Sequence, residues 1–242
     1  AMKQIAQIAK TTKIAFFGTP CQVAAVDKIL CKKNLREQAI IVDLICNGVP
    51  SYYLWNKYLK EIDKKHHTGT SPSVSFRSKE REWRRRLLLL SSGEHTYKKE
   101  EHKDDFYAFF RRGLCYMESC SDCPYRERSA ADIRIGDYWG DKFAYDKQGV
   151  SMVIANTTQG EQIVNVLGES NACETARQSL TEYWSVQFPY NPPRPLIREQ
   201  LITELKDDNI GLHTLRSKYC AYYDQMEQIS KMTHTLKKIV KL

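Results

Sequence analysis

The chain has 242 residues, a formal net charge of +8 and a hydrophobic fraction of 42%. This composition is ordinary for a soluble globular protein, and no apolar run approaches the roughly 20 residues that a membrane-spanning helix needs. The first residues also lack the apolar core of a secretory signal peptide, so the sequence predicts a cytoplasmic protein without a membrane span.

The basic charge and the cysteines limit the classes of function further. A basic face attracts nucleic acid, but no helix-turn-helix, zinc-finger or RNA-binding signature accompanies the charge, so no nucleic-acid partner is expected. The charge instead favours a surface that docks an acidic partner or an anionic cofactor. Eight cysteines in a chain of this kind favour metal ligation or redox chemistry over disulfides.

The apolar pattern along the chain predicts an α/β fold. Helices are expected at residues 1–12, 23–31, 51–65, 106–112 and 161–169. Strands are expected at residues 13–17, 39–45, 74–76, 87–90, 133–136 and 150–156. Strand–turn–helix units around Cys21, Cys46 and Asn156 predict parallel strands joined by right-handed crossovers. The strand at 133–136 is expected beside at least one of the first two strands.

The expected architecture is a mostly parallel or mixed sheet with flanking helices and a C-terminal helical extension. A proline-rich stretch at 191–195 is expected to end the compact domain, which gives one domain over 1–195 and a helical extension over 196–242. The last helix of that extension, from about residue 222 to 242, is basic and amphipathic. Such a helix can bind a membrane surface or a partner, but docking on its own domain is the commoner arrangement.

The cysteines predict a metal site. Cys115, Cys120 and Cys123 have the spacing Cys-x4-Cys-x2-Cys, and the turn between the last two would let both sulfurs face one metal. Iron–sulfur clusters and structural zinc both use such turns, and both need further thiolates. Cys21 and Cys46 each follow a predicted strand and complete a set of four for one [4Fe–4S] cluster. Cys115 is a reserve ligand because its spacing matches a plant-type ferredoxin.

Four ordered motifs carry a resemblance to a known family. They are Gly-Thr-Pro-Cys-Gln at 18–22, Asp-x-x-Cys-Asn-Gly-Val-Pro-Ser at 43–51, Ser-Cys-x-x-Cys-Pro-Tyr at 119–125 and Asp-Ile-x-Ile-Gly-Asp-Tyr-Trp-Gly at 132–140. In order and spacing they resemble the C-terminal domain of the coenzyme F420 hydrogenase/dehydrogenase beta-subunit family, over roughly residues 13–218. The chain departs from that pattern at Asn47, where the family usually has His, and at Met117-Glu118, where it commonly has Arg-Pro.

The resemblance implies an enzyme, or part of one, that is an oxidoreductase with FAD and iron–sulfur clusters. It would pass electrons between a [4Fe–4S] cluster, FAD and a deazaflavin such as coenzyme F420 or another organic substrate. Its partners would be a small-molecule electron donor or acceptor and a redox protein. The family normally carries a ferredoxin-like segment and a flavin-contacting half before this point, so the chain is expected to be an excised domain or a short relative.

The resemblance names no catalytic residue, but it implies contacts with the cofactor at the strand ends and in the charged connection after residue 76. The predicted cofactor-binding residues are Gly18, Thr19, Pro20, Gln22, Asn47, Gly48, Arg77, Lys79, Asp137, Tyr138 and Trp139. For Asp137–Trp139 a structural reading stays open, because a Trp at a strand end is often buried and an Asp before it often caps a turn.

A second function from a different class also remains. The same thiolates could bind zinc or nothing, and the domain could serve as a non-catalytic interaction scaffold. Colour separates the two hypotheses, since an iron–sulfur protein purified without oxygen is brown and a zinc protein is colourless.

Overall fold

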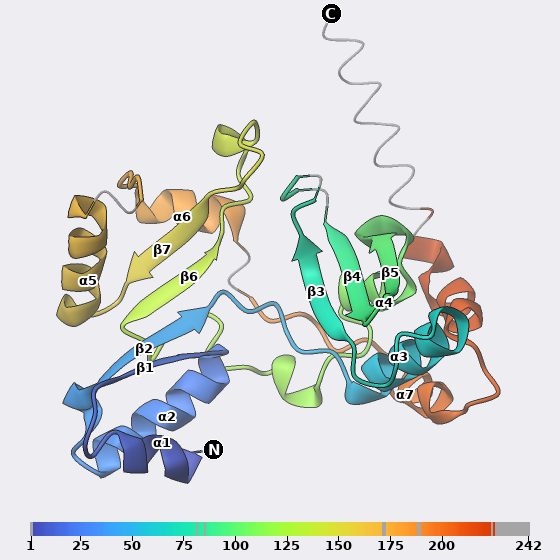
Figure 1. Cartoon of the computed structure of the whole chain (residues 1–242), viewed down its shortest axis with the longest axis horizontal. Coiled ribbons are helices and arrows are strands. Elements are labelled where there is room, and N and C mark those ends of the chain that lie inside the picture. The colour runs from blue at the N-terminus through green and yellow to red at the C-terminus, as the bar shows by residue number, and fades with distance from the viewer. Residues whose placement is uncertain are drawn as a thin grey trace, which may run out of the picture. The chain divides into compact units, whose positions relative to one another are not determined.

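The computed structural model describes residues 2–80, 82–84, 86–170, 173–187, 190–223 and 225. The chain forms two compact units, each with its own sheet (Figure 1). Unit 1 comprises Ala1–Asn47 and Ser119–Pro192, and unit 2 comprises Gly48–Glu118 and Pro193–Leu242. The expected division at residue 195 concerns the boundary of the family domain and stays a prediction. No helix in the described part of the chain is long and apolar enough to cross a bilayer.

The sheet of unit 1 has four strands. In spatial order they are β1 (Ile14–Gly18), β2 (Ala39–Leu44), β6 (Ile133–Asp137) and β7 (Ser151–Ala155). β1, β2 and β6 run parallel, and β6 lies directly beside β2, which confirms the expected neighbour. The sheet is therefore mixed, as the α/β fold class allows.

The expectation of a parallel strand in the unit around Asn156 is wrong, because β7 pairs antiparallel with β6. The reason is the connection between the two strands. The Tyr138 N–H donates to the carbonyl of Val150 at 2.9 Å, so the chain turns back and closes a wide hairpin with only the short helix η4 (Asp141–Phe143) inside it. A parallel strand would have needed a crossover, usually a helix.

Helices flank this sheet and bury one of its faces. In unit 1 they are α1 (Met2–Ile8), α2 (Pro20–Lys32), η1 (Arg36–Gln38), α5 (Thr158–Glu169) and α6 (Leu180–Val186). The core lies between α2 and the first two strands, where Val23, Val26 and Leu30 pack with Ala39 and Ile41. In the sequence these residues recur at helical spacing in α2 and at every second position in β2, so each set lies on one face of its element.

Unit 2 is built on an antiparallel sheet. Its strands are β3 (Ser73–Ser78), β4 (Leu87–Ser92) and β5 (His95–Glu100), in that order. Its helices are α3 (Tyr52–His66), η2 (Glu101–Lys103), α4 (Asp105–Phe110) and α7 (Arg198–Lys206), with further helical backbone at 212–223. The sequence did not predict β5, because of its six residues only Tyr97 is buried and the strand shows no apolar alternation. Residues 226–242 of the predicted last helix lie outside the described residues.

The core of unit 2 joins α3 to the sheet and to the other helices. Leu54 and Tyr58 of α3 are at most 2% exposed and pack in one cluster with Leu88 of β4, Phe109 of α4 and Leu201 of α7. Tyr58 and Trp55 of α3 therefore serve as core, which is what their helical spacing favours, whereas Tyr52 of the same stripe is 69% exposed.

Candidate functional site

Two of the predicted ligands of unit 1, Cys21 and Cys46, follow strands that end at one edge of the sheet. Because β1, β2 and β6 are parallel and in register, their carboxyl ends share that edge. The Ile45 N–H donates to the Ile135 carbonyl at 2.8 Å and extends the pairing of β2 by one residue, so Cys46 is the first residue beyond it. Ligands of open α/β sheets gather at such an edge.

Cys21 lies in the first turn of α2, directly after β1. Its side chain is exposed, and its sulfur is 3.3 Å from the hydroxyl of Thr19. The side-chain oxygen of Gln22 accepts a 3.0 Å hydrogen bond from the Thr19 N–H, and Pro20 occupies a first-turn position where no N–H is needed. Thr19, Pro20 and Gln22 thus start the helix and hold Cys21 at its positive end.

Cys46, Cys120 and Cys123 are all partly buried. Cys120 closes the short helix η3 (Glu118–Cys120), and the carbonyl of Cys123 accepts a 3.0 Å hydrogen bond from the Asn191 amide. The side-chain oxygen of Asn191 in turn accepts from Nε of Arg126 at 3.1 Å. The segment that carries the Cys-x2-Cys pair is therefore tied on its C-terminal side.

A buried ion pair fixes the next part of that segment. Arg134 of β6 donates from Nε and Nη2 to the two carboxylate oxygens of Asp43 on β2, both at 2.8 Å. Its Nη atoms also donate to the carbonyls of Tyr125 and Arg126, and the Ser129 hydroxyl donates to Asp43 at 2.7 Å. The polypeptide after Cys123 thus folds around one guanidinium.

The guanidinium of Arg134 stays positively charged. Burial favours the neutral form, but the hydrogen bonds and the charge of Asp43 outweigh it and raise the pKa of Arg134. The two side chains are only 4% and 0% exposed. A buried pair of this geometry orders its surroundings because neither charge can be left alone.

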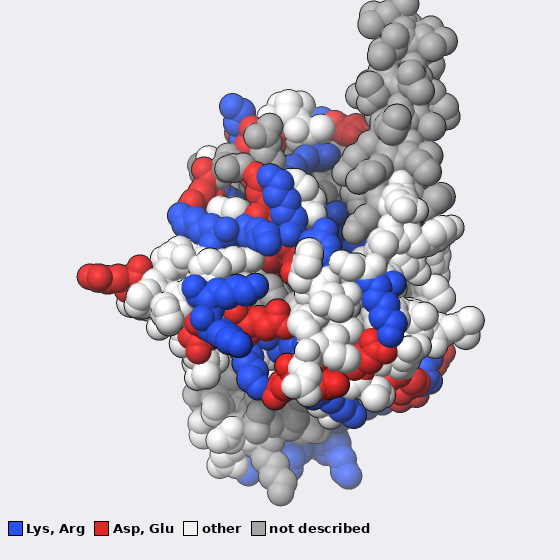
Figure 2. All heavy atoms as spheres, turned by 90° about the vertical axis from the view of Figure 1, so that its right-hand side faces the viewer, with Lys and Arg blue, Asp and Glu red and all other residues white. Residues whose placement is uncertain are grey.

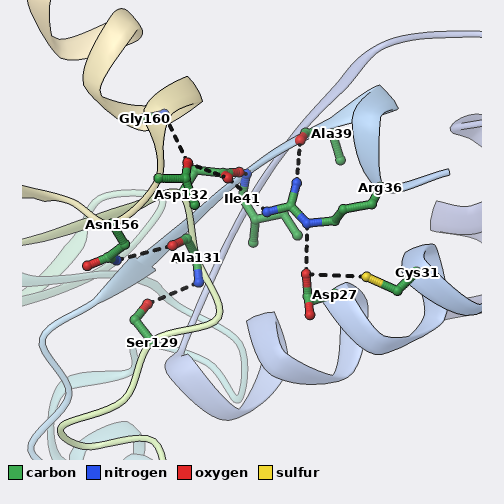
Figure 3. Close-up of polar contacts among 11 residues, drawn as sticks. Asp27, Cys31, Arg36, Ala39, Ile41, Ser129, Ala131, Asp132, Asn156 and Gly160 are labelled. Carbon is green, nitrogen blue, oxygen red and sulfur yellow. Dashed lines mark hydrogen bonds and ion pairs between the residues drawn. The ribbon is translucent and has the colours of Figure 1, made fainter. Parts of the chain in front are cut away.

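A second polar network lies at the amino end of the same strands (Figure 3). The Asp132 carboxylate accepts from the Ile41 N–H at 2.8 Å, and from Arg36 and the Thr157 hydroxyl, both at 2.9 Å. Arg36 also pairs with Asp27 of α2 at 2.7 Å. Burial opposes the charge of Arg36, but these carboxylates outweigh it and raise its pKa. Asp132, the first residue of the fourth motif, is therefore a structural residue at the edge opposite Cys21 and Cys46.

At the end of β6, the Asp137–Trp139 segment makes contacts that hold the fold of unit 1 together. Tyr138 is buried, and its hydroxyl bonds the carboxylate of Glu182 on α6. The carbonyl of Asp137 accepts from the Gln187 amide at 3.0 Å. Asp137 and Trp139 are partly exposed, so contact of their side chains with a flavin stays a prediction.

The other predicted contacts divide between the units. Asn47 is exposed at the end of unit 1, whereas Gly48, Arg77 and Lys79 belong to unit 2. Gly48 has a φ of 125°, and a Cβ there would clash with the ring of Tyr116, so this position requires glycine. A contact of these residues with a cofactor stays a prediction.

The reserve ligand Cys115 lies in unit 2 and is fully buried. Burial raises the pKa of its thiol to about 12, so the folded chain keeps the thiol protonated. Among the described residues no group of three or more His, Cys, Asp or Glu side chains is arranged to hold a metal ion. Thiolates are the donors that iron–sulfur clusters use, and Cys21, Cys46, Cys120 and Cys123 are accessible because none of them is fully buried. This ligand set stays a prediction.

The burial of the thiols predicts their reactivity in metal-free protein. At about pH 8 we expect iodoacetamide to modify the exposed Cys21, Cys31 and Cys173 and to spare Cys115 and Cys220, because only an accessible thiolate reacts. Peptide mass spectrometry after short exposure would measure this. In protein unfolded by guanidinium, iodoacetamide should alkylate all the cysteines at similar rates. Rapid labelling of Cys115 in folded protein would contradict the described packing of unit 2.

Comparison with known proteins gives the family. The family model for the C terminus of the beta subunit of coenzyme F420 hydrogenase/dehydrogenase matches residues 11–179, which is well over half of the chain and includes all four motifs. No curated protein matches the chain. The family is one of redox subunits, which supports a function of the oxidoreductase type. The chain therefore belongs to the family defined by the C-terminal domain of the coenzyme F420 hydrogenase/dehydrogenase beta subunit.

Proposed function

We propose that the chain is the iron–sulfur flavoprotein component of an oxidoreductase. It would pass electrons between a [4Fe–4S] cluster, FAD and a deazaflavin-like or other organic substrate, together with a redox protein partner. The observation that supports this most is the position of Cys21 and Cys46 after adjacent parallel strands of unit 1. The Cys120–Cys123 segment belongs to the same unit, and the family supplies the redox class.

We assign the roles of the residues from their types and their positions in the fold. Cys21, Cys46, Cys120 and Cys123 would hold the cluster, which when bound supplies one-electron transfer, while FAD supplies hydride transfer. Gln22 keeps Cys21 in the first turn of α2 through its bond to the Thr19 N–H. The proposed contacts with the flavin remain Gly18, Thr19, Pro20, Gln22, Asn47, Gly48, Arg77, Lys79, Asp137, Tyr138 and Trp139.

Iron analysis of cysteine variants tests the proposal. After anaerobic reconstitution with iron and sulfide, we expect about four iron atoms per chain in the wild type, and loss of iron and of brown colour in Cys21→Ser, Cys46→Ser, Cys120→Ser and Cys123→Ser. Cys31→Ser and Cys173→Ser are matched controls, because both thiols are exposed and neither is a predicted ligand. Circular dichroism would show that each variant is folded.

Two results would contradict the proposal. One is a colourless wild-type chain that binds stoichiometric zinc and no iron, which would favour the interaction scaffold. The other is iron content unchanged in all four ligand variants, which would place the cluster, if any, on other cysteines.

A further inference from the structure

Unit 2 contains a cavity outside the predicted cofactor residues. Its volume is about 390 Å³, and it is lined by Arg84, Arg86, Glu100, Glu101, His102 and Arg111. A second hollow of about 340 Å³ shares Glu100 and is lined also by Glu80, Leu87, Lys98, Lys99 and Lys103. The first volume lies within the range of about 300–1,000 Å³ that small-molecule sites occupy.

Positive charge exceeds negative charge in the first cavity. Glu101 is 6% exposed and pairs with both Arg86 and Arg111, the latter at 3.1 Å, so one carboxylate serves two guanidinium groups. Glu100 pairs with Lys103 at 3.1 Å and lies 3.6 Å from Nε2 of His102, which lines the same cavity. The described lining thus holds three arginines and two glutamates. Figure 2 shows that Lys and Arg side chains are interspersed with Asp and Glu side chains over one face of the molecule.

The pKa of Arg86 agrees with this excess of positive charge. Burial lowers the pKa of Arg86, and the charge of Glu101 opposes that effect. The charges of Arg111 and Arg77 then lower the pKa further. Repulsion between these arginines therefore persists although Glu101 lies among them. A bound anion would relieve it, because opposite charges interact strongly in a partly buried site.

Aromatic packing orients one of the guanidinium groups that line the cavity. The Arg84 guanidinium carbon lies 5.1 Å from the centre of the Trp83 ring. Arg77, which does not line the cavity, lies 5.8 Å from the same ring. Trp83 itself is only 5% exposed and is thus fixed in the core. Stacked arginines present planar forks of donors that fit the oxygens of phosphate better than lysine does.

We infer that this cavity binds the phosphate group of a small molecule, with Arg84, Arg86 and Arg111 as its ligands. A phosphate carries up to two negative charges and three acceptor oxygens, which suits several guanidinium forks around one buried carboxylate. Glu100 and Glu101 in the wall disfavour a long acidic chain, and the cavity has the size of a small ligand. The phosphate could come from the diphosphate of FAD, the flavin of the proposed function, or from a separate phosphorylated substrate.

Calorimetric titration of the full chain tests the inference. The probes are inorganic pyrophosphate, ADP and FAD, with riboflavin and succinate as ligands that lack phosphate. We expect the three phosphate compounds to bind, and Arg84→Gln and Arg111→Lys each to weaken them by at least about tenfold, because a charged hydrogen bond is lost or its geometry spoiled. Arg194→Gln is the matched control: it removes one exposed arginine of unit 2 that lines neither hollow.

The outcomes separate the sources of the phosphate and the two proposals. Competition between pyrophosphate and FAD assigns the site to the flavin diphosphate, and simultaneous binding assigns it to another phosphorylated ligand. Absence of pyrophosphate binding, or equal losses in Arg84→Gln and Arg194→Gln, would overturn the inference. If the chain binds pyrophosphate through Arg84 but holds no iron, this inference stands and the proposed function is contradicted. If the chain holds the cluster but does not bind pyrophosphate, the proposed function stands and this inference is overturned.

Discussion

Replacing Arg134 by Met should lower the free energy of unfolding by about 3–5 kcal/mol, because it leaves the Asp43 carboxylate buried without its partner. Asp43 is 0% exposed, and the Ser129 hydroxyl alone cannot balance its charge. The carbonyls of Tyr125 and Arg126 would lose their donor at the same time. We therefore expect the segment after Cys123 to lose its order before the rest of unit 1 does.

Urea denaturation measures the loss, and two further variants make it specific. The double variant Arg134→Met/Asp43→Leu should recover part of it, since replacement of a whole buried pair by apolar groups is often tolerated. Arg194→Met removes an exposed arginine and should leave the stability nearly unchanged. Equal stability of the single and double variants would show that the buried charge of Asp43 is not the cause.

The same pair bears on the proposed cluster. Because Arg134 holds the backbone that follows Cys123, its loss should reduce iron uptake even though all four predicted ligands are present. The effect would be one of positioning, so a higher concentration of iron and sulfide during reconstitution should restore part of the iron content. A variant of Cys123 would not respond in this way.

Periodicity was enough to predict most elements and their order. The strands at 13–17, 39–45 and 133–136 correspond to β1, β2 and β6, because each is a short apolar run. Only β2 has the continuous burial of a central parallel strand, whereas exposed and partly buried residues alternate along the edge strand β1. The orientation of β7 could not be predicted in this way, since a hairpin and a crossover leave similar apolar runs. A hairpin and a crossover differ only in the connection between β6 and β7, which here is short and, along its described residues, holds no long helix.

The charged residues inside the strands are the part of the site that sequence reasoning missed. Asp43 and Arg134 each interrupt an apolar strand, and both side chains are buried. A buried charge is rare unless it is paired, so two such positions of opposite sign in strands expected to be neighbours were a usable signal. The arginines of the cavity in unit 2 gave no such signal, because a run of basic residues is usually a solvated connection.

A second buried carboxylate should matter as much in unit 2. Asp104 is 0% exposed and accepts hydrogen bonds from the hydroxyls of Tyr58, at 2.7 Å, and Tyr97, at 3.2 Å. It also caps α4 by accepting from the Tyr107 N–H at 3.1 Å. Burial, followed by the charge of Asp104, raises the pKa of Tyr58, so this phenol remains a donor. The carboxylate thus joins α3, β5 and α4.

Asp104→Ala should lower the free energy of unfolding by about 3–5 kcal/mol, because it leaves two buried hydroxyls and a helix N–H without an acceptor. Tyr97→Phe removes only the longer of the two hydroxyl bonds and should lower it by about 1 kcal/mol. Thermal and urea unfolding of both variants would measure the difference, and the thiol of Cys115, buried in the same cluster, would report the packing of unit 2 through its alkylation rate. If Asp104→Ala were no less stable than Tyr97→Phe, water would have to satisfy the groups that Asp104 now accepts from, and the carboxylate would not be the link between these three elements.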